Sequence, residues 1–160
     1  MDRVVSVQVH DLLGSSSAEE LASFGFPTDE PADVAVLRLR ALADDPLRSW
    51  VVEGTVTLLE TLRGRLDGGG TGKRRLFVPV VWEPPGLGAA EHEAVSALIG
   101  AVRAVVHSAT LESSANAVRC NVIVMDETSL GDATSALRFL ASSDGAFAAG
   151  ATFDVRASGR

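Results

Sequence analysis

The sequence predicts an α/β protein built on one parallel sheet of about five strands, with helices on both faces of the sheet. Short segments rich in β-branched residues alternate along the chain with longer segments of helical periodicity. Clusters of Gly, Pro, Asp and Ser separate these segments and mark the turns. At 160 residues the chain is long enough for one domain with a real core, and we expect a single domain over 1–160.

The first half of the chain predicts two strands and two helices. Valines fill the first strand, at 3–9, and the second strand covers 33–39. A serine-led helix at 17–24 and a Gly- and Pro-containing loop at 25–32 lie between them. A long helix at 46–66 follows, and it is apolar around much of its circumference. We therefore expect this helix to be buried on two sides.

The second half continues the alternation. Strands are predicted at 75–82, 118–124 and 150–156, and helices at 90–114 and 132–142. Strands that alternate with helices favour parallel pairing through right-handed crossovers.

The helix at 90–114 has two faces that can pack. Large apolar residues recur at helical spacing on one face: Val95, Leu98, Ile99, Val102, Val105 and Val106. Small residues form the second face: Ala94, Ala97, Ala101, Ala104 and Ser108. A face of small residues lets another backbone approach closely, so we expect one face to pack on the sheet and the other on a helix or a second chain.

The formal net charge of −7 excludes several classes of partner. A nucleic-acid or anionic-membrane surface would carry a basic patch. The only basic cluster is 73–75, which we read as a solvated loop. No apolar run reaches the roughly 18 residues of a membrane span, and the N-terminus does not look like a signal peptide. We expect a protein that binds neither nucleic acid nor membrane.

The single cysteine, Cys120, allows no intrachain disulfide, which fits the reducing cytoplasm. It lies in a predicted buried strand, where an inert packed thiol is expected. Heavy use of Ala, Gly, Val and Arg is typical of a GC-rich bacterial genome. We expect a cytoplasmic, bacterial protein.

Two features suggest a ligand site, but neither matches the pattern that such a site requires. The run 68–73, GGGTGK, lacks a phosphate loop's first glycine and final Ser or Thr, because Asp67 and Arg74 stand there. It also follows a helix, whereas a phosphate loop follows a strand. The histidines are scattered, without the spacing of metal ligands. We therefore expect no metal and no bound cofactor.

The motifs at 54–55, 118–122 and 137–155 resemble those of the short-chain dehydrogenase/reductase family, nearest to its ketoacyl-reductase-like members. Residues 118–122, VRCNV, are similar to the family's R-V-N-x-V strand, and 137–155 resemble its closing FLASD…G…V segment. Gly54 and Thr55 match the N-x-x-G-T of a family helix. The resemblance covers roughly 33–160 and implies a truncated Rossmann-like fold.

The resemblance also implies that the family's chemistry is lost. The catalytic Tyr, Lys and Asn of the family fall at Val95, Ile99 and Val51, and its catalytic Ser falls within 82–85, WEPP. The chain has no tyrosine, and its only lysine, Lys73, lies in a loop far along the chain. The family's reduction needs a phenol to protonate the developing alkoxide and a lysine to lower the pKa of that phenol. The N-terminal glycine-rich cofactor loop is missing as well, so we expect no catalytic residue here.

The resemblance implies that this chain retains the surfaces through which members of the family assemble. Family dimers pack two long helices of each chain against their copies, and larger assemblies use the last helix and strand. The resemblance therefore implies a pseudoenzyme that forms a heterodimer with a catalytic, NADPH-dependent ketoreductase, in bacterial polyketide or fatty-acyl biosynthesis. The expected interface residues are Trp50, Gly54, Leu58, Ala94, Ala97, Ala101, Ala104, Ser108, Phe139 and Phe153.

Two alternatives remain open. Glu83, Asp126, Glu127 and Asp11 lie near the carboxyl ends of predicted strands, where parallel sheets place ligands. They could form a repurposed site in a small-molecule-binding protein or enzyme. The chain could also be a homodimeric structural relic, because a homodimer would use the same helix faces.

Overall fold

The computed structural model describes residues 4–5, 8–11, 26–27, 32–39, 47–67, 75–112 and 118–157. Its main sheet is parallel throughout, with the spatial order β2 (Gln8–Asp11), β4 (Ala32–Arg38), β5 (Arg75–Glu83), β7 (Val122–Asp126) and β8 (Thr152–Asp154). A short strand, β6 (Val118–Cys120), pairs with the start of β5 and precedes β7 along the same side of it.

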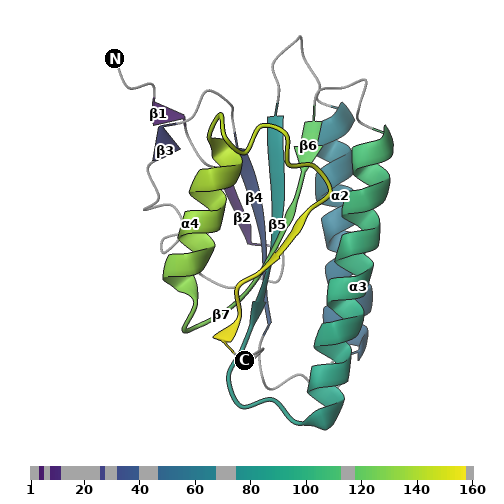
Figure 1. The fold of residues 1–160 in the computed structure, drawn as a ribbon. Helices are drawn as coiled ribbons and strands as arrows, with labels where there is room; N and C mark the ends of the chain where they lie inside the picture. The colour runs from purple at the N-terminus through teal and green to yellow at the C-terminus, as the bar shows by residue number, and fades with distance from the viewer. Residues whose placement is uncertain are drawn as a thin grey trace.

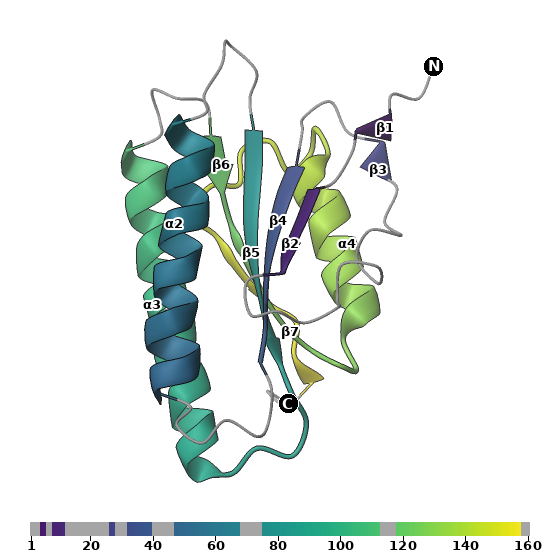
Figure 2. The same ribbon diagram turned by 180° about the vertical axis from the view of Figure 1, so that it is seen from behind.

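Helices cover both faces of this sheet, as Figures 1 and 2 show. A π-helical turn, η1 (Leu47–Val52), leads into α2 (Glu53–Asp67), which lies beside α3 (Ala89–Glu112) on one face. The opposite face carries α4 (Leu130–Ala141). The expected parallel sheet with helices on both faces is confirmed.

The N-terminal prediction needs correction. The valine-rich segment at 3–9 does not form one strand, because β1 (Val4–Val5) and β2 are separate and only β2 joins the main sheet. Instead, β1 pairs antiparallel with β3 (Phe26–Pro27), inside the segment predicted as loop. Valine-rich segments favour strand pairing without specifying the partner strand, so the sequence could not reveal the break. The helix predicted at 17–24 lies outside the described residues.

Two apolar clusters form the core, one on each face. The cluster under α2 and α3 includes Leu37, Phe77, Leu58, Leu98 and Val102, all nearly inaccessible. The second cluster packs α4 on the other face of β5 and β7. The central strands are therefore buried on both sides, which explains their nearly continuous apolar sequence.

The strand predicted at 118–124 is interrupted at Asn121, whose side chain is fully buried. Its amide nitrogen donates to the carbonyl of Ala148 at 3.0 Å, and its amide oxygen accepts from the N–H of Ala151 at 3.0 Å. The neighbouring Arg119 guanidinium donates to the carbonyls of Leu140 and Gly145. These bonds fasten the connection between α4 and β8 to the sheet.

That connection also depends on glycine. A Cβ on Gly145 would lie 2.1 Å from the carbonyl oxygen of Phe139, a distance that real Cβ atoms do not reach. Gly150 has a φ of +70°, a conformation that favours glycine. The segment resembling the family's closing motif is thus shaped by packing against the end of α4.

The expectation that the protein binds no membrane stays a prediction. Within the described residues, α3 is the one helix that is long and apolar enough to cross a membrane, by length and composition only. The core helix of a soluble protein passes the same test, and α3 packs on the sheet.

Replacing Arg119 by Met should destabilise the fold. Its guanidinium satisfies the carbonyls of Leu140, Gly145 and Ala148 at 2.7, 2.6 and 3.0 Å, and Met would leave them without this donor. We expect the free energy of unfolding to fall by about 2–3 kcal/mol in urea denaturation. Arg138→Met, at an exposed position of α4, should change it by less than about 0.5 kcal/mol. Equal effects of the two substitutions would contradict the fastening role of Arg119.

Candidate functional site

An apolar surface lies on the side of α2 and α3 that faces away from the sheet. We call it the outer helix face, and it comprises Val52 of η1, Val56 and Leu59 of α2, and Ala97, Ala101, Ala104, Val105, Ser108 and Leu111 of α3. Val52, Val56 and Leu59 are 57, 48 and 47% exposed and recur at a spacing of four and three residues, so they form one stripe along η1 and α2. Large aliphatic side chains exposed in a row mark an interaction surface.

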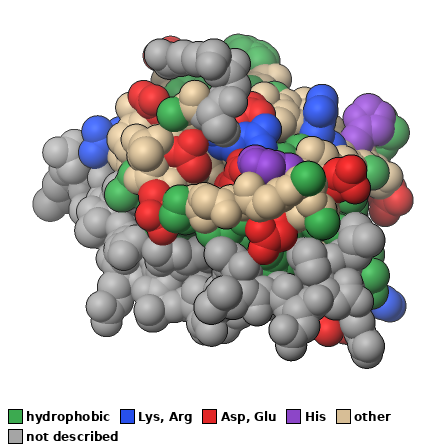
Figure 3. Space-filling view, turned by 90° about the horizontal axis from the view of Figure 1, so that it is seen from below, with side chains coloured by type: hydrophobic (Ala, Val, Ile, Leu, Met, Phe, Trp, Pro, Cys, Tyr) green, Lys and Arg blue, Asp and Glu red, His purple; other side chains and the backbone are tan. Residues whose placement is uncertain are grey.

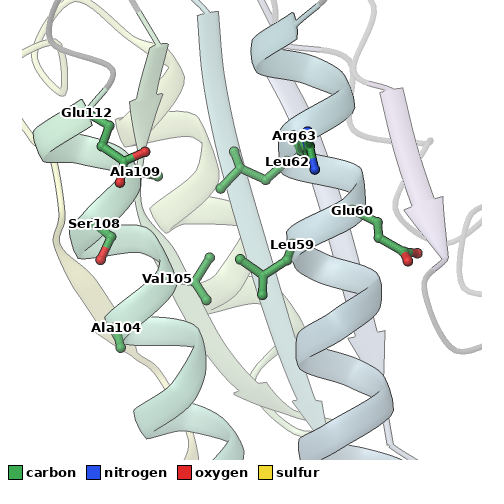
Figure 4. A pocket seen from close by; sticks show the side chains of 9 residues that line it. All are labelled: Leu59, Glu60, Leu62, Arg63, Ala104, Val105, Ser108, Ala109 and Glu112. Carbon is green, nitrogen blue, oxygen red and sulfur yellow. The ribbon is translucent and has the colours of Figure 1, made fainter.

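A groove runs between the two helices within this face, with a volume of about 700 Å³. Figure 4 shows Leu59 and Leu62 of α2 and Val105 of α3 pointing into the space between the helices. Ala104 and Ser108 line the α3 side of the groove, and their small side chains protrude little from the helix. Three charged side chains, Glu60, Arg63 and Glu112, also line the groove, so its lining is of mixed polarity.

The predicted interface residues divide into three groups. Ala97, Ala101, Ala104 and Ser108 lie on the outer helix face, where Ala101 is half-buried and the others are exposed.

The second group lies in the core of this chain. Trp50, Leu58 and Ala94 are 2, 0 and 0% exposed, and Gly54 packs near Leu98. These residues lie on the sides of the helices that face the sheet, where they pack in the core cluster with strand residues. They are corrected from interface to core, and a second chain could not touch them.

The aromatic residues near the C-terminus form another, smaller apolar patch. Phe139 of α4 is 43% exposed, and its ring centroid lies 6.2 Å from that of Phe153 in β8. Phe147, in the fastened connection between them in sequence, is 96% exposed. Sequence reasoning named the first two residues and missed Phe147, because nothing in its local pattern distinguishes an exposed Phe from a buried one.

The α2 stripe was also missed as an interface. Val52, Val56 and Leu59 form a second apolar side of the helix in the sequence. The periodicity alone does not tell which of two apolar sides faces the sheet. The structure settles this, because Leu58 and Leu62 pack inward.

The positions that the resemblance equates with catalytic residues are apolar and packed. Val95 is 1% exposed in the cluster under α2 and α3, and Val51 and Ile99 pack against that cluster.

A group of charged side chains lies at the carboxyl ends of β5, β7 and β8, seen end-on in Figure 3, where acidic, basic and histidine side chains gather near the middle. Glu83 is only 5% exposed, and its carboxylate accepts a hydrogen bond from Arg156 at 2.9 Å. Arg156 also binds Asp154 at 2.6 Å. His92, from the first turns of α3, places Nδ1 3.5 Å from the other oxygen of Glu83.

Hydrogen bonds shift the pKa values of Asp154, Arg156 and Asp126. The hydrogen bond from Arg156 lowers the pKa of Asp154, and the same bond raises the pKa of Arg156. Burial alone would raise the pKa of Asp126, but hydrogen bonds from Thr128 and Ala157 lower it below its ordinary value. All three groups are therefore held in their charged forms and are satisfied within the chain.

The residues of the alternative ligand site are brought together only in part. Glu83 and Asp126 are neighbours across β5 and β7. Glu127 is exposed in the following turn, and the side chain of Asp11 lies outside the described ones. Among the residues that the structure describes, no group of three or more His, Cys, Asp and Glu could hold a metal ion.

No model of a known protein family matches this chain, and no curated protein is significantly similar to it. The resemblance to short-chain dehydrogenases/reductases therefore stays a prediction from the motifs.

Cys120 should be inert in the folded chain. The thiol is fully buried, and burial raises its pKa from the ordinary 9.0 to about 12. At pH 8 we expect the thiol of Cys120 in the folded chain to react with a thiol reagent at least about tenfold more slowly than in the urea-unfolded chain.

Burial of Cys120 also makes the stability depend on pH. Because the pKa of the thiol is raised in the folded chain, its contribution to stability is complete below pH 9 and is lost as the pH rises towards 12. Cys120→Ala should remove that part of the alkaline decline, and an unchanged decline would contradict the assignment.

Proposed function

We propose that this chain is a non-catalytic subunit that binds another chain through the outer helix face. The exposed apolar stripe Val52, Val56 and Leu59, beside the small residues of α3, is the observation that carries the proposal. Water contact with these side chains is unfavourable, and a partner helix laid along the groove would remove it.

The geometry of the face favours helix–helix packing. Small residues recur along the exposed side of α3 at Ala97, Ala101, Ala104 and Ser108, which allows close approach of a second helix. The larger residues of α2 stand beside this shallow strip and can act as knobs between the partner's side chains. Two helices from each chain would then form a four-helix arrangement.

The proposed partner is a catalytic, NADPH-dependent ketoreductase of the short-chain dehydrogenase/reductase family. The motifs at 118–122 and 137–155 support this choice, because they resemble that family. The apolar side chains of Val95, Ile99 and Val51 support a subunit that leaves the chemistry to its partner. We place the pair in the bacterial cytoplasm, in polyketide or fatty-acyl biosynthesis.

The strand-end alternative has less support. Glu83 and Asp126 are engaged within the chain, by Arg156 and by Thr128 and Ala157. A ligand there would first have to replace these interactions.

A tryptophan in the shallow strip should block association without unfolding the chain. Ala104 is exposed and lines the groove, so Ala104→Trp would fill the space that the partner needs. Ala101→Trp should act in the same way. We expect co-purification of the partner from the native host to fall at least about tenfold, while the melting temperature stays within about 3 °C of the parent.

Arg103→Trp is the matched control. It is exposed on the same helix between the two alanines, but 100° per residue turns it away from the strip. It should retain the partner. The captured complex should reduce a ketoacyl thioester with NADPH, and the isolated chain should not. Equal recovery of the partner with the parent chain, the Ala104→Trp variant and the Arg103→Trp variant would contradict the interface assignment. A co-purified protein without reductase activity would contradict the proposed partner class.

A further inference from the structure

The connection between α4 and β8 contains an Asp–Gly pair, Asp144–Gly145. Such pairs are especially prone to cyclise, because glycine has no side chain to hinder the approach of its backbone nitrogen to the Asp carboxyl. Asp144 is exposed, whereas Gly145 is buried. The carboxyl is therefore accessible to water, and the reaction depends on whether the nitrogen of Gly145 can reach it.

The chemistry needs no reactant other than water. The nitrogen of Gly145 gives up its proton and forms a bond to Cγ of Asp144, while the bond from Cγ to the carboxyl hydroxyl breaks and one water leaves. Water then opens the five-membered imide at either carbonyl. Opening at Cγ restores aspartate, and opening at the α-carbonyl gives isoaspartate, in which the backbone runs through Cβ. Nothing is oxidised or reduced, and the mass of the chain is unchanged.

The fold holds both backbone groups of Gly145. Its N–H donates to the carbonyl of Ser142 at 3.2 Å. Its carbonyl accepts from the Arg119 guanidinium at 2.6 Å and from the N–H of Ala148 at 3.0 Å. Its Cα lies against the end of α4, where a Cβ would collide with the carbonyl oxygen of Phe139. While these contacts persist, the nitrogen is free neither to lose its proton nor to turn towards the carboxyl.

Isoaspartate does not fit the closed connection. The N–H of Gly145 closes one turn onto the carbonyl of Ser142 at 3.2 Å. The N–H of Ala146 closes the next turn onto the carbonyl of Ser143, also at 3.2 Å. Both turns include residue 144, so isoaspartate adds one backbone atom to each. Gly145 cannot move towards α4 to absorb that atom, because no space remains there.

We propose that Asp144–Gly145 is a self-modification site that Arg119 keeps closed, and that its isoaspartate product holds the connection open. Opening of the connection frees the N–H of Gly145 for proton loss and for cyclisation. The same opening therefore governs hydrogen exchange at Gly145 and isomerisation of Asp144. This site is independent of the outer helix face, which lies along α2 and α3.

Two measurements on the full chain test the protection of the site. Amide hydrogen exchange reports opening at Gly145, and peptide mapping that resolves isoaspartate reports modification of Asp144. In the folded parent, both processes should be at least about tenfold slower than in the urea-unfolded chain. The second Asp–Gly pair of the sequence, Asp67–Gly68, gives the reference rate for an unprotected pair in urea.

Arg119→Met should accelerate isomerisation of Asp144 and exchange at Gly145 at least about tenfold, by factors that agree within about threefold. Arg138→Met, an exposed substitution on α4, should change each rate by less than about threefold. Faster exchange at Gly145 with unchanged isomerisation overturns the proposal. So does isomerisation in the folded parent at the reference rate in urea.

Arg119→Lys covers the case in which the Met variant does not fold. Lysine keeps the charge and loses the planar fork, so both rates should lie between those of the parent and those of the unfolded chain. Parent-like rates for both processes in every folded Arg119 variant overturn the role of Arg119.

The effect of the product is tested on chain that carries isoaspartate at 144 alone, formed in urea, refolded and separated by chromatography. Exchange at Gly150 should be at least about tenfold faster than in unmodified chain treated alike, because its N–H donates to the carbonyl of Cys120 in the closed connection. Asp144→Glu, which would have to close a six-membered ring, should yield no modified fraction at 144. Equal exchange at Gly150 in modified and unmodified chain overturns the claim that the product holds the connection open.

Discussion

The structure depends on how α2 and α3 divide their apolar surface. Both helices cover one face of a parallel sheet whose central strands are buried on both sides, and this requires a continuous apolar side on each helix. Each helix also has an apolar or small-residue side that the sheet does not cover. Leu58 and Leu62 of α2 pack inward, while Val56 and Leu59, from the same turns, face water. The side of each helix that faces the sheet is therefore buried, while the opposite side leaves apolar side chains in contact with water.

The rest of the molecule contrasts with that surface. Polar groups at the sheet ends are satisfied within the chain, as Glu83 is by Arg156 and Asn121 is by Ala148 and Ala151. Arg119 and Asn121, two residues of the motif that resembles a reductase strand, fasten the connection that leads into β8. Among the described residues, the large apolar side chains that are exposed lie on η1, α2, α3 and α4 and in the connection between α4 and β8.

Much of the fold could be predicted because its central elements are strongly periodic. The sheet strands β4, β5 and β7 and the helices α2, α3 and α4 follow the apolar patterns closely. The N-terminal strands could not be predicted, since valine-rich segments do not specify their partners. The break at Asn121 depends on Ala148 and Ala151, which are 27 and 30 residues away in sequence. No local pattern carries that information.

The candidate site was predicted only in part, for a related reason. Helical spacing placed Ala97, Ala104 and Ser108 correctly on one exposed strip. It also assigned Trp50, Leu58 and Ala94 to the interface, although they face the sheet. A helix with two apolar sides gives the same periodicity whichever side is inward, so only tertiary packing distinguishes them. The ion pair between Arg156 and Glu83 was not predicted, because the two residues are 73 positions apart in the sequence.

The central claim is that the outer helix face is an interface that water does not normally contact. Sedimentation velocity of the isolated chain over a wide concentration range tests it most directly. Without its partner, the uncovered face should drive self-association, and the weight-average sedimentation coefficient should rise with concentration. A single monomeric species at every concentration would contradict the account.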